Sequence, residues 1–210
     1  MKDRPTFDAN DLRRLAATRL SREPADKAGR GDGDLNSGFL IEVAAAFVPA
    51  AVLVPVIERA SGLTVLLTER TADLPSHPGQ VAFPGGKIDP GDAGPLAAAL
   101  REAEEEIGLD RRFIEPIGYL DTYQTGSGFL IVPAVALITE GFALRLNARE
   151  VAAAFEVPLA FLLDPANHHR QSREWRGKLR HYYEIRYDGH RIWGVTAGIV
   201  RNLHDRLAAS

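Results

Sequence analysis

Hydrophobic residues recur along this chain with helical and strand-like spacings, which predict where its helices and strands lie. Near the N-terminus, apolar residues three or four positions apart predict a helix from Asp8 to Leu20. The next stretch, Ser21 to Ser37, is rich in glycine and charge and predicts a loop or flexible connection. We therefore divide the chain into an N-terminal helix with its connection, residues 1–37, and a main domain, residues 38–210.

Apolar and β-branched runs predict six strands in the main domain. They are Ala51–Glu58, Leu63–Glu69, Ile114–Thr122, Leu130–Thr139, His181–Tyr187 and Arg191–Trp193. Residues 59–62 separate the first two runs and have the composition of a hairpin turn. Asp188-Gly189 separates the last two and is a strong hairpin signal. The sequence therefore predicts two β-hairpins.

Two further helices and a long loop complete the pattern. Helical spacing runs from Pro95 to Ile107 and stops at Gly108, a residue type that commonly terminates helices. It returns from Thr196 to Leu207. Between residues 70 and 94, four prolines and the Gly85-Gly86 pair predict a loop. A loop of this length is either held in place by other groups or mobile.

Composition and charge narrow the function classes. The 210 residues are 45% hydrophobic and 25% charged, as in an average globular protein with a sizeable core. The net charge of −3 gives no broad basic field that would attract nucleic acid or an anionic membrane. Prolines interrupt the longest apolar stretch, Val43–Ile57, which is shorter than the roughly 20 residues of a membrane helix. Residues 1–20 lack a signal-peptide core, and the chain has no cysteine, so we expect a cytoplasmic protein.

Three glutamates lie on one face of the predicted 95–107 helix. At about 100° per residue, Glu102, Glu105 and Glu106 lie roughly 120° from its apolar face. Carboxylates this close repel one another, by on the order of tenths of a kcal/mol per exposed pair. A divalent cation would remove that repulsion, and hard oxygen ligands suit Mg²⁺ or Mn²⁺. The alternative is a solvated acidic face, which is common on helices taken alone.

The residues before these glutamates favour a metal site over a solvated face. The loop Phe83–Gly86 ends in two glycines, which let backbone carbonyls and amides approach a metal or phosphate closely. Arg101 precedes the first glutamate and can pair with a carboxylate and fix its rotamer. The helix and this loop therefore form a candidate catalytic site.

The segment from Gly86 to Leu109 resembles the Nudix box. Residues 101–109, REAEEEIGL, match its closing Arg-Glu-apolar-any-Glu-Glu-any-Gly-apolar pattern at every defined position. The first half departs from the pattern, because Asp92 stands where glutamate is usual and the gap to Arg101 is one residue longer. The resemblance implies the Nudix α/β/α sandwich with a central mixed β-sheet, and a hydrolase that acts on phosphoanhydride bonds.

The same resemblance assigns roles to named residues. The expected site residues are Glu102, Glu105, Arg101 and Glu150 for catalysis, Arg70, Gly85 and Gly86 for substrate binding, and Glu102, Glu105 and Glu106 for the metal. The metal would neutralise the diphosphate, stabilise the leaving phosphate and acidify the attacking water. A carboxylate outside the box often completes such sites, and we favour Glu150 over Glu156 for it. Arg70 is equally well explained as a phosphate contact or as a structural ion pair at a strand end.

A second resemblance concerns the substrate. The segments 66–71 (LLTERT) and 78–86 (PGQVAFPGG) resemble the signature that precedes the box in coenzyme A pyrophosphatases. Thr71 stands where serine is usual, and Pro75 replaces a basic residue that is often expected midway. Further similarity at residues 150–159 and 192–197 extends the resemblance over about residues 50 to 207. It implies hydrolysis of coenzyme A, or a derivative, to phosphopantetheine and adenosine 3′,5′-bisphosphate.

Two other functions stay open. The box recognises a diphosphate and not what is attached to it, so a Nudix hydrolase of ADP-ribose, dinucleotides or oxidised nucleotides is one alternative. A non-catalytic nucleotide-binding Nudix module is the other, although a binder need not retain all three glutamates. The expected partner is a small nucleotide, not nucleic acid or a membrane, and a homodimer is compatible with the sequence. Trp193 is expected in the core. Tyr123–Phe129 is expected to be an ordinary strand connection rather than a substrate loop.

Overall fold

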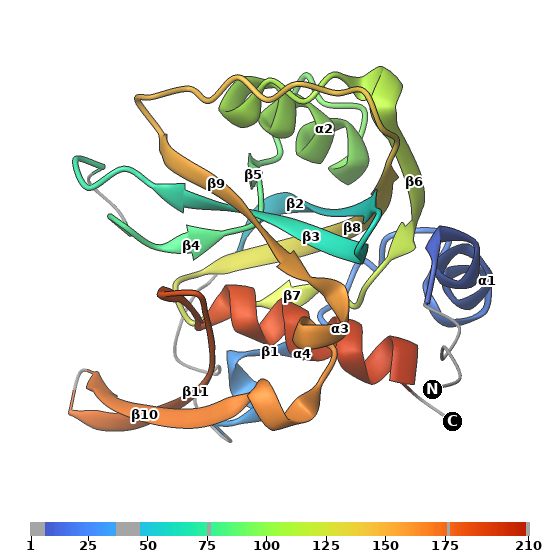
Figure 1. The fold of residues 1–210 in the computed structure, drawn as a ribbon. Helices are drawn as coiled ribbons and strands as arrows, with labels where there is room; N and C mark the ends of the chain where they lie inside the picture. The colour runs from blue at the N-terminus through green and yellow to red at the C-terminus, as the bar shows by residue number, and fades with distance from the viewer. Residues whose placement is uncertain (1–6, 37–46, 75–76, 176, 209–210) are drawn as a thin grey trace.

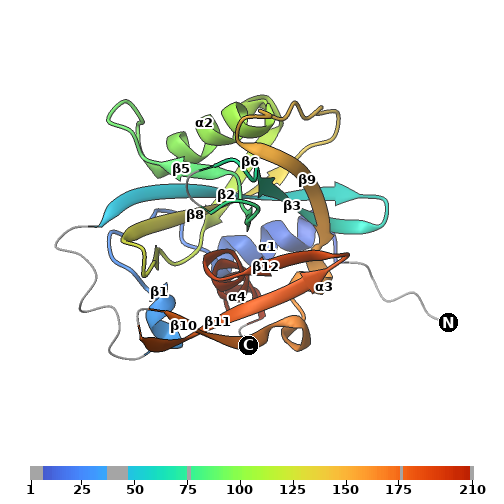
Figure 2. The ribbon, with the colours of Figure 1, turned by 90° about the vertical axis from the view of Figure 1, so that its left-hand side faces the viewer.

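A mixed β-sheet runs through the middle of the molecule and carries helices on both faces (Figure 1). The computed structural model describes residues 7–36, 47–74, 77–175 and 177–208. The helices are α1 (Ala9–Arg19), α2 (Pro95–Ile107), α3 (Leu159–Leu162) and α4 (Val195–Ala208). Helix α2 covers one face of the sheet, and α1 and α4 cover the other (Figures 1 and 2). The predicted α/β/α sandwich is therefore confirmed.

Nine strands form this central sheet, and three more form a small second sheet. The central strands are β1 (Arg30–Gly31), β2 (Val48–Arg59), β3 (Gly62–Arg70), β4 (Val81–Ala82), β5 (Gly85–Lys87), β6 (Ile114–Tyr119), β7 (Tyr123–Gln124), β8 (Phe129–Ile138) and β9 (Val151–Pro158). Their order is β1-β7-β8-β2-β3-β4, with β5 paired to β2, β6 to β8 and β9 to β3. Strands β2 and β8 are parallel, as are β1 and β7, and the other pairs are antiparallel.

The second sheet lies below α4 in Figure 1 and has the order β10-β11-β12. Its strands are β10 (His169–Trp175), β11 (Lys178–Tyr187) and β12 (His190–Trp193). Both predicted hairpins are confirmed, because Arg59 pairs with Gly62 and Tyr187 pairs with His190. Strands β4, β5, β7, β9 and β10 were not predicted, and β4 and β5 are short strands within the stretch that was predicted to be a loop. Among the described residues, no helix is both long and apolar enough to cross a membrane.

Helix α2 has the bounds that the sequence predicts. Pro95 occupies its first turn, where a missing N–H costs nothing, and Gly108 ends it in the left-handed conformation with φ of 67°. Its buried alanines, Ala98, Ala99 and Ala103, bring the helix close to the sheet. This close packing determines how near the glutamates of α2 lie to the neighbouring strand β5.

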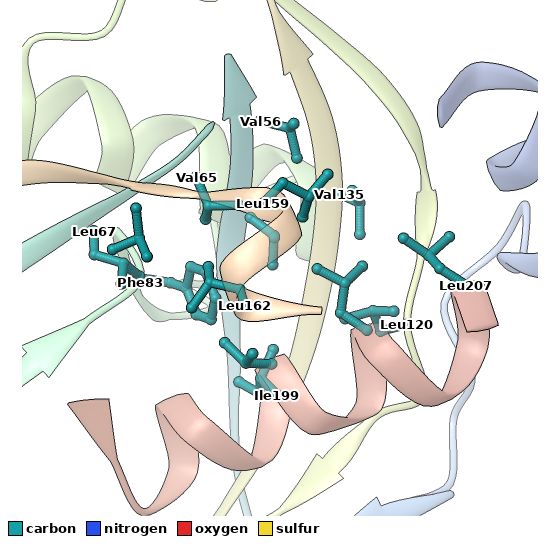
Figure 3. Close-up of a cluster of buried hydrophobic side chains, with 14 of the residues drawn as sticks. Val56, Val65, Leu67, Phe83, Leu120, Val135, Leu159, Leu162, Ile199 and Leu207 are labelled. Atoms are coloured by element: carbon teal, nitrogen blue, oxygen red, sulfur yellow. The ribbon is translucent and has the colours of Figure 1, made fainter. Parts of the chain in front are cut away.

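Two hydrophobic clusters form the core, one on each face of the central sheet. Strand β2 supplies both, because Leu53 and Ile57 point toward α2 while Val54 and Val56 point the other way. Figure 3 shows the second cluster, in which Ile199 of α4 lies beneath the sheet. The apolar stretch predicted as buried strand is thus β2, and its first residues, 43–46, lie outside the described residues.

Helix α1 packs into the same core as α4. Its buried residues Leu12 and Ala16 belong to the cluster shown in Figure 3, and Arg13 hydrogen-bonds Glu115 of β6 at 2.7 Å. The stretch after it contains β1 and a short 3-10 turn, Asp32–Asp34, neither of which was predicted. The predicted boundary between residues 37 and 38 lies outside the described residues, and the division into two parts stays a prediction.

Candidate active site

The three glutamates of α2 differ sharply in exposure. Glu106 is only 5% exposed, Glu102 is half-buried, and the Glu105 side chain is 56% exposed. All three lie on one side of α2, with Glu106 buried against the sheet and Glu105 directed toward solvent. The three carboxylates therefore lie together but are not equivalent.

Burial dominates the chemistry of Glu106. Its pKa is raised to about 7: desolvation is the largest cause, Glu102 and Glu150 add to it, and a backbone hydrogen bond and the charge of Arg70 oppose it. That hydrogen bond comes from the Gly85 N–H, which donates to Glu106 Oε2 at 3.1 Å. Near pH 7 this carboxyl is therefore poised between its neutral and charged forms.

Gly85 and Gly86 leave no room for side chains between α2 and β2. A Cβ on Gly86 would overlap the Glu102 carboxylate, and a Cβ on Gly85 would collide with the backbone of Ala51 and Val52. Strand β5, which contains both glycines, pairs with β2 at this point. The predicted close approach of backbone to the glutamates is thus present, and it depends on both glycines.

Arg101 connects the acidic residues around α2. Its guanidinium donates to Asp92 at 3.0 and 3.1 Å, to Glu102 at 2.9 Å and to Glu105 at 3.1 Å. It also donates to the Lys87 carbonyl at 3.1 Å. These charge-assisted bonds hold the pKa of Asp92 below its ordinary value. Asp92, which departs from the usual box, therefore anchors Arg101, while Arg101 orients two of the glutamates.

Glu150 lies beside the acidic helix and Glu156 does not. The charge of Glu150 raises the pKa of both Glu102 and Glu106, so the three carboxyl groups share one neighbourhood. Asn147 positions it, because its side chain donates to Glu150 Oε1 at 3.1 Å and its N–H donates to the Glu106 carbonyl at 2.9 Å. The geometry thus favours Glu150 as the additional carboxylate.

Glu156 belongs to a different ion pair. It accepts hydrogen bonds from Arg59 at 2.5 and 3.0 Å and from Thr64 at 2.6 Å. Arg59 also lowers its pKa. Glu156 is therefore a structural partner of the β2–β3 hairpin.

Arg70 lies at the end of β3, next to the acidic residues. Its charge lowers the pKa of Glu106. Among the described residues, its Nε atom is buried without a hydrogen-bond partner, and no ion pair joins its guanidinium to a carboxylate. The structural ion pair that we considered for Arg70 is therefore not formed there. A buried donor without a partner is costly unless a ligand binds it.

Within the described part of the chain, no three acidic, histidine or cysteine side chains converge on one point. Glu102 and Glu105 are instead bonded to Arg101. The donor set nevertheless fits a divalent cation, because mutual repulsion and burial raise the pKa of Glu102 and Glu106 and a cation would relieve both.

Two adjoining hollows lie at the end of β4, near Arg70. One has a volume of about 540 Å³ and lies between Glu69, residues 77–81 and the β11–β12 turn. The other has a volume of about 360 Å³ and lies between β11, β12 and the 126–127 turn. His77, Gln80 and Trp193 line both. The core placement expected for Trp193 is therefore wrong, since it is half-buried in the wall of a hollow.

Another expectation concerns the segment Tyr123–Phe129. It is a strand connection, as favoured, but Gly126 and Ser127 within it also line the 360 Å³ hollow. His168 is buried and hydrogen-bonds the Leu162 carbonyl at 2.7 Å. Pro75, the departure in the upstream signature, lies outside the described residues.

Comparison with known proteins identifies the family. The NUDIX domain model matches residues 47–176. The chain is 44% identical over 158 residues to "Uncharacterized Nudix hydrolase NudL" of Photorhabdus laumondii, which covers 75% of this chain and 84% of that protein. The protein of the same name from Escherichia coli K12 is 42% identical over 155 residues, covering 73% and 80%.

Solved structures give weaker matches. The Caenorhabditis elegans Ap4A hydrolase binary complex is 23% identical, with a TM-score of 0.47, and the match covers 53% of this chain and 80% of that one. RenU, a Nudix hydrolase from M. smegmatis, is 25% identical, with a TM-score of 0.44, over 57% and 75%. From the matching domain and the NudL relatives, we conclude that this chain belongs to the Nudix hydrolase family and is a pyrophosphohydrolase.

Proposed function

We propose that this enzyme hydrolyses the diphosphate linkage of coenzyme A, or of a coenzyme A derivative, with the help of Mg²⁺ or Mn²⁺. The observation that carries the proposal is the position of the coenzyme A-type signature. Its Arg70 has a buried guanidinium nitrogen that no described residue bonds, and it lies beside Glu106 of the Nudix box. The signature and the box thus contribute opposite charges to one site.

Nudix hydrolases generally depend on a divalent metal. In this chain Glu102 and Glu106 would hold it, Glu105 would share in this, and the Gly85 carbonyl would add a ligand. When bound, the metal neutralises phosphate charge and acidifies water. Hard cations of this kind prefer carboxylate oxygens and keep open positions for water and phosphate.

Arg101 acts as a positioning residue in this proposal. Its bonds to Asp92 and the Lys87 carbonyl fix the guanidinium, which then limits the rotamers of Glu102 and Glu105. A bound cation would take the place of Arg101 as the partner of Glu102. Asp92 would still hold Arg101, because its two bonds to the guanidinium do not involve the glutamates.

Arg70 and Glu150 act on the substrate and the water. Arg70 contacts the diphosphate, whose oxygens satisfy its buried Nε. Glu150 accepts a proton from the attacking water as its oxygen bonds to phosphorus. The bond from that phosphorus to the bridging oxygen breaks, and the second phosphate leaves with the electron pair. The products are phosphopantetheine and adenosine 3′,5′-bisphosphate.

Product analysis tests this proposal. Purified protein is incubated with coenzyme A and Mg²⁺ or Mn²⁺, and the products are resolved by chromatography. We expect the two phosphorylated products only when metal is present. Good turnover of ADP-ribose with no turnover of coenzyme A would remove the coenzyme A assignment and favour the other hydrolase. Absence of turnover over a nucleotide panel would favour a non-catalytic module.

A further inference from the structure

Strand β10 pairs with a neighbouring strand on one side only. Its seven residues, His169–Trp175, all pair with β11 without a shift in register, and no described strand pairs with the other side of β10. The strand contains no proline. A strand edge presents unpaired N–H and C=O groups, which form a template for another strand. β10 therefore offers a second strand a regular edge along its whole length.

The other described strands with a single partner strand have features that discourage further pairing. β1, β4, β5 and β12 are two to four residues long. β6 and β9 each skip one residue in their pairing, at Ile117 and Ala152, and such a bulge bends a strand. On β11, beyond the residues that pair with β12, the His181 N–H donates to the Asn36 side chain, which donates to the His181 carbonyl, both at 2.8 Å. Among these strands, β10 alone is both long and regular.

The side chains along the middle of β10 are polar and exposed. They are Arg170, Gln171, Ser172, Arg173 and Glu174. None of the three charged side chains forms an ion pair with another described residue. Charges on a strand edge oppose self-pairing when like charges face each other, and favour it when opposite charges do. The order of the charges along β10 therefore decides whether two copies repel or attract.

Symmetry limits how two copies of β10 can pair. In an antiparallel pair, residues directly opposite each other point to the same face of the sheet. A two-fold axis between two identical strands therefore places one residue opposite its own copy. With the axis at Ser172, the middle residue of β10, the whole of each strand pairs. Arg170 then lies opposite Glu174 of the partner subunit, and symmetry repeats this attraction.

Other registers are less favourable. With the axis at Arg173, two arginines lie directly opposite each other and repel. With the axis at Gln171, only residues 169–173 pair, and Arg170 lies opposite the uncharged Ser172 of the partner subunit. The axis at Ser172 is therefore the register that combines full overlap with complementary charge.

The β10 edge lies far from the acidic helix. Figures 1 and 2 both show α2 at the top of the molecule and β10 at its lower margin. Two copies that meet along β10 therefore keep both acidic faces away from the contact. Because of this separation, the contact is expected to leave catalysis unchanged, and its existence does not depend on the proposed function.

We propose that two copies of this chain associate through β10, in antiparallel register about Ser172, so that their β10–β12 sheets form one continuous sheet. Backbone hydrogen bonds along the edge supply the affinity, as in other strand additions. The two Arg170–Glu174 pairs select the register, because electrostatic complementarity favours one arrangement over the others. The contact is small, so the dimer is reversible, with a dissociation constant on the order of 100 µM.

An exchange of charges tests the pairing. Sedimentation equilibrium, from about 10 µM to about 1 mM, compares the intact protein with Arg170→Glu, Glu174→Arg and the variant that carries both changes. Each single change should weaken the dimer at least about tenfold, because two symmetric pairs change from attraction to repulsion. The double variant restores opposite charges, so its dissociation constant should lie within about threefold of that of the intact protein. The control Arg112→Glu, in the turn after α2, should leave the dimer unchanged.

The two single changes shift the net charge in opposite directions, so general repulsion between copies cannot explain a loss in both. Thermal melts at about 1 µM, where the protein is monomeric, verify that each variant is folded. A protein that stays monomeric throughout, or a dimer that neither single change weakens, would overturn the proposal. A double variant that associates as weakly as the single variants would also overturn it.

Disulfide trapping tests the register. The chain has no cysteine, so Ser172→Cys introduces a single thiol, which lies directly opposite its copy in the proposed dimer. Under mild oxidation at about 100 µM, this variant should cross-link at least about tenfold faster than Gln171→Cys, whose two thiols are two positions apart along the strands. Faster cross-linking of Gln171→Cys, or equal rates for both variants, would overturn the proposed register.

Discussion

The acidic face of α2 and the β10–β12 sheet each contain one charged side chain that is shared by several side chains of the opposite charge. On α2, a single cation, Arg101, is shared by Asp92, Glu102 and Glu105. On the second sheet, a single anion, Glu184, is shared by two arginines. On α2, three carboxylates share one arginine, so negative charge is in excess, which suits a divalent cation. On the second sheet, the buried carboxylate of Glu184 is neutralised within the sheet by Arg186 and Arg191.

The largest effect is expected from removing the buried carboxylate of Glu106. Glu106→Gln keeps the shape of the side chain but removes one of the proposed metal ligands. We expect kcat to fall about 1000-fold, equivalent to roughly 4 kcal/mol of transition-state stabilisation. Steady-state assays with coenzyme A measure this. The matched control is Glu104→Gln, an exposed residue on the same helix, which should stay within about twofold. Equal activity of the two variants would contradict the metal role.

Loss of Arg70 should have the next largest effect. Arg70→Gln removes the guanidinium that we propose contacts the diphosphate, and we expect kcat/KM to fall about 100-fold, as for a charged group that binds a transferring phosphate. The control is Arg112→Gln, an exposed arginine in the turn between α2 and β6. If Arg70→Gln instead lowers thermal stability and leaves kcat/KM intact, its role is structural.

The pH dependence of metal binding tests the burial of Glu106. Its pKa of about 7 means that protons compete with the metal below neutrality. The apparent Mn²⁺ affinity should therefore fall by up to about tenfold for each pH unit below 7 and level off above it. Titration of the protein at pH 6, 7 and 8 measures this slope. Glu106→Gln should flatten the profile, and an unchanged slope in that variant would assign the proton to another group.

The smallest effect is expected for Glu184, the carboxylate that two arginines share in the second sheet. Burial raises the pKa of Glu184, but hydrogen bonds from Arg186 and Arg191 outweigh it, so the net pKa lies below the ordinary value. A depressed carboxyl pKa contributes stability above the unfolded-state pKa, and this contribution is lost as pH falls through the folded-state pKa. Glu184→Gln should cost about 1 kcal/mol of unfolding free energy at pH 7.

Urea unfolding at several pH values measures that difference. The gap between the intact protein and Glu184→Gln should shrink as pH falls into the range where Glu184 is protonated. Glu174→Gln, an exposed position on neighbouring β10, is the control and should cost little at any pH. A gap that is independent of pH would show that packing, not charge, makes Glu184 important.

Local signals explain the parts of the fold that the sequence predicts well. Helix α2 matches its predicted bounds because Pro95 and Gly108 act on their own turns and the apolar spacing is regular. The two hairpins are similarly local. Strand β10 was missed because its residues, His169 to Glu174, are polar and largely exposed, which removes the hydrophobic alternation. Strand β9 was missed because Ala152–Ala154 have low strand propensity and are positioned by pairing with β3.

Long-range contacts explain what the sequence could not predict about the site. The glutamates could be predicted because helical spacing places them together. The pairing of Asp92 with Arg101 could not, because Asp92 lies in a loop without hydrophobic periodicity. The choice between Glu150 and Glu156 depends on the turn at Asn147, which holds Glu150 beside Glu106. Trp193 was predicted to be a core residue, but it lies in the wall of a cavity that distant segments form together.

Binding of Mn²⁺ to the acidic face tests the central claim most directly. Electron paramagnetic resonance counts the ions bound by the intact protein, by Glu106→Gln and by Glu104→Gln, at pH 8 and without substrate. We predict binding to the intact protein and to Glu104→Gln, and at least tenfold weaker binding to Glu106→Gln. Equal Mn²⁺ binding by all three proteins would contradict the claim that α2 holds the catalytic metal.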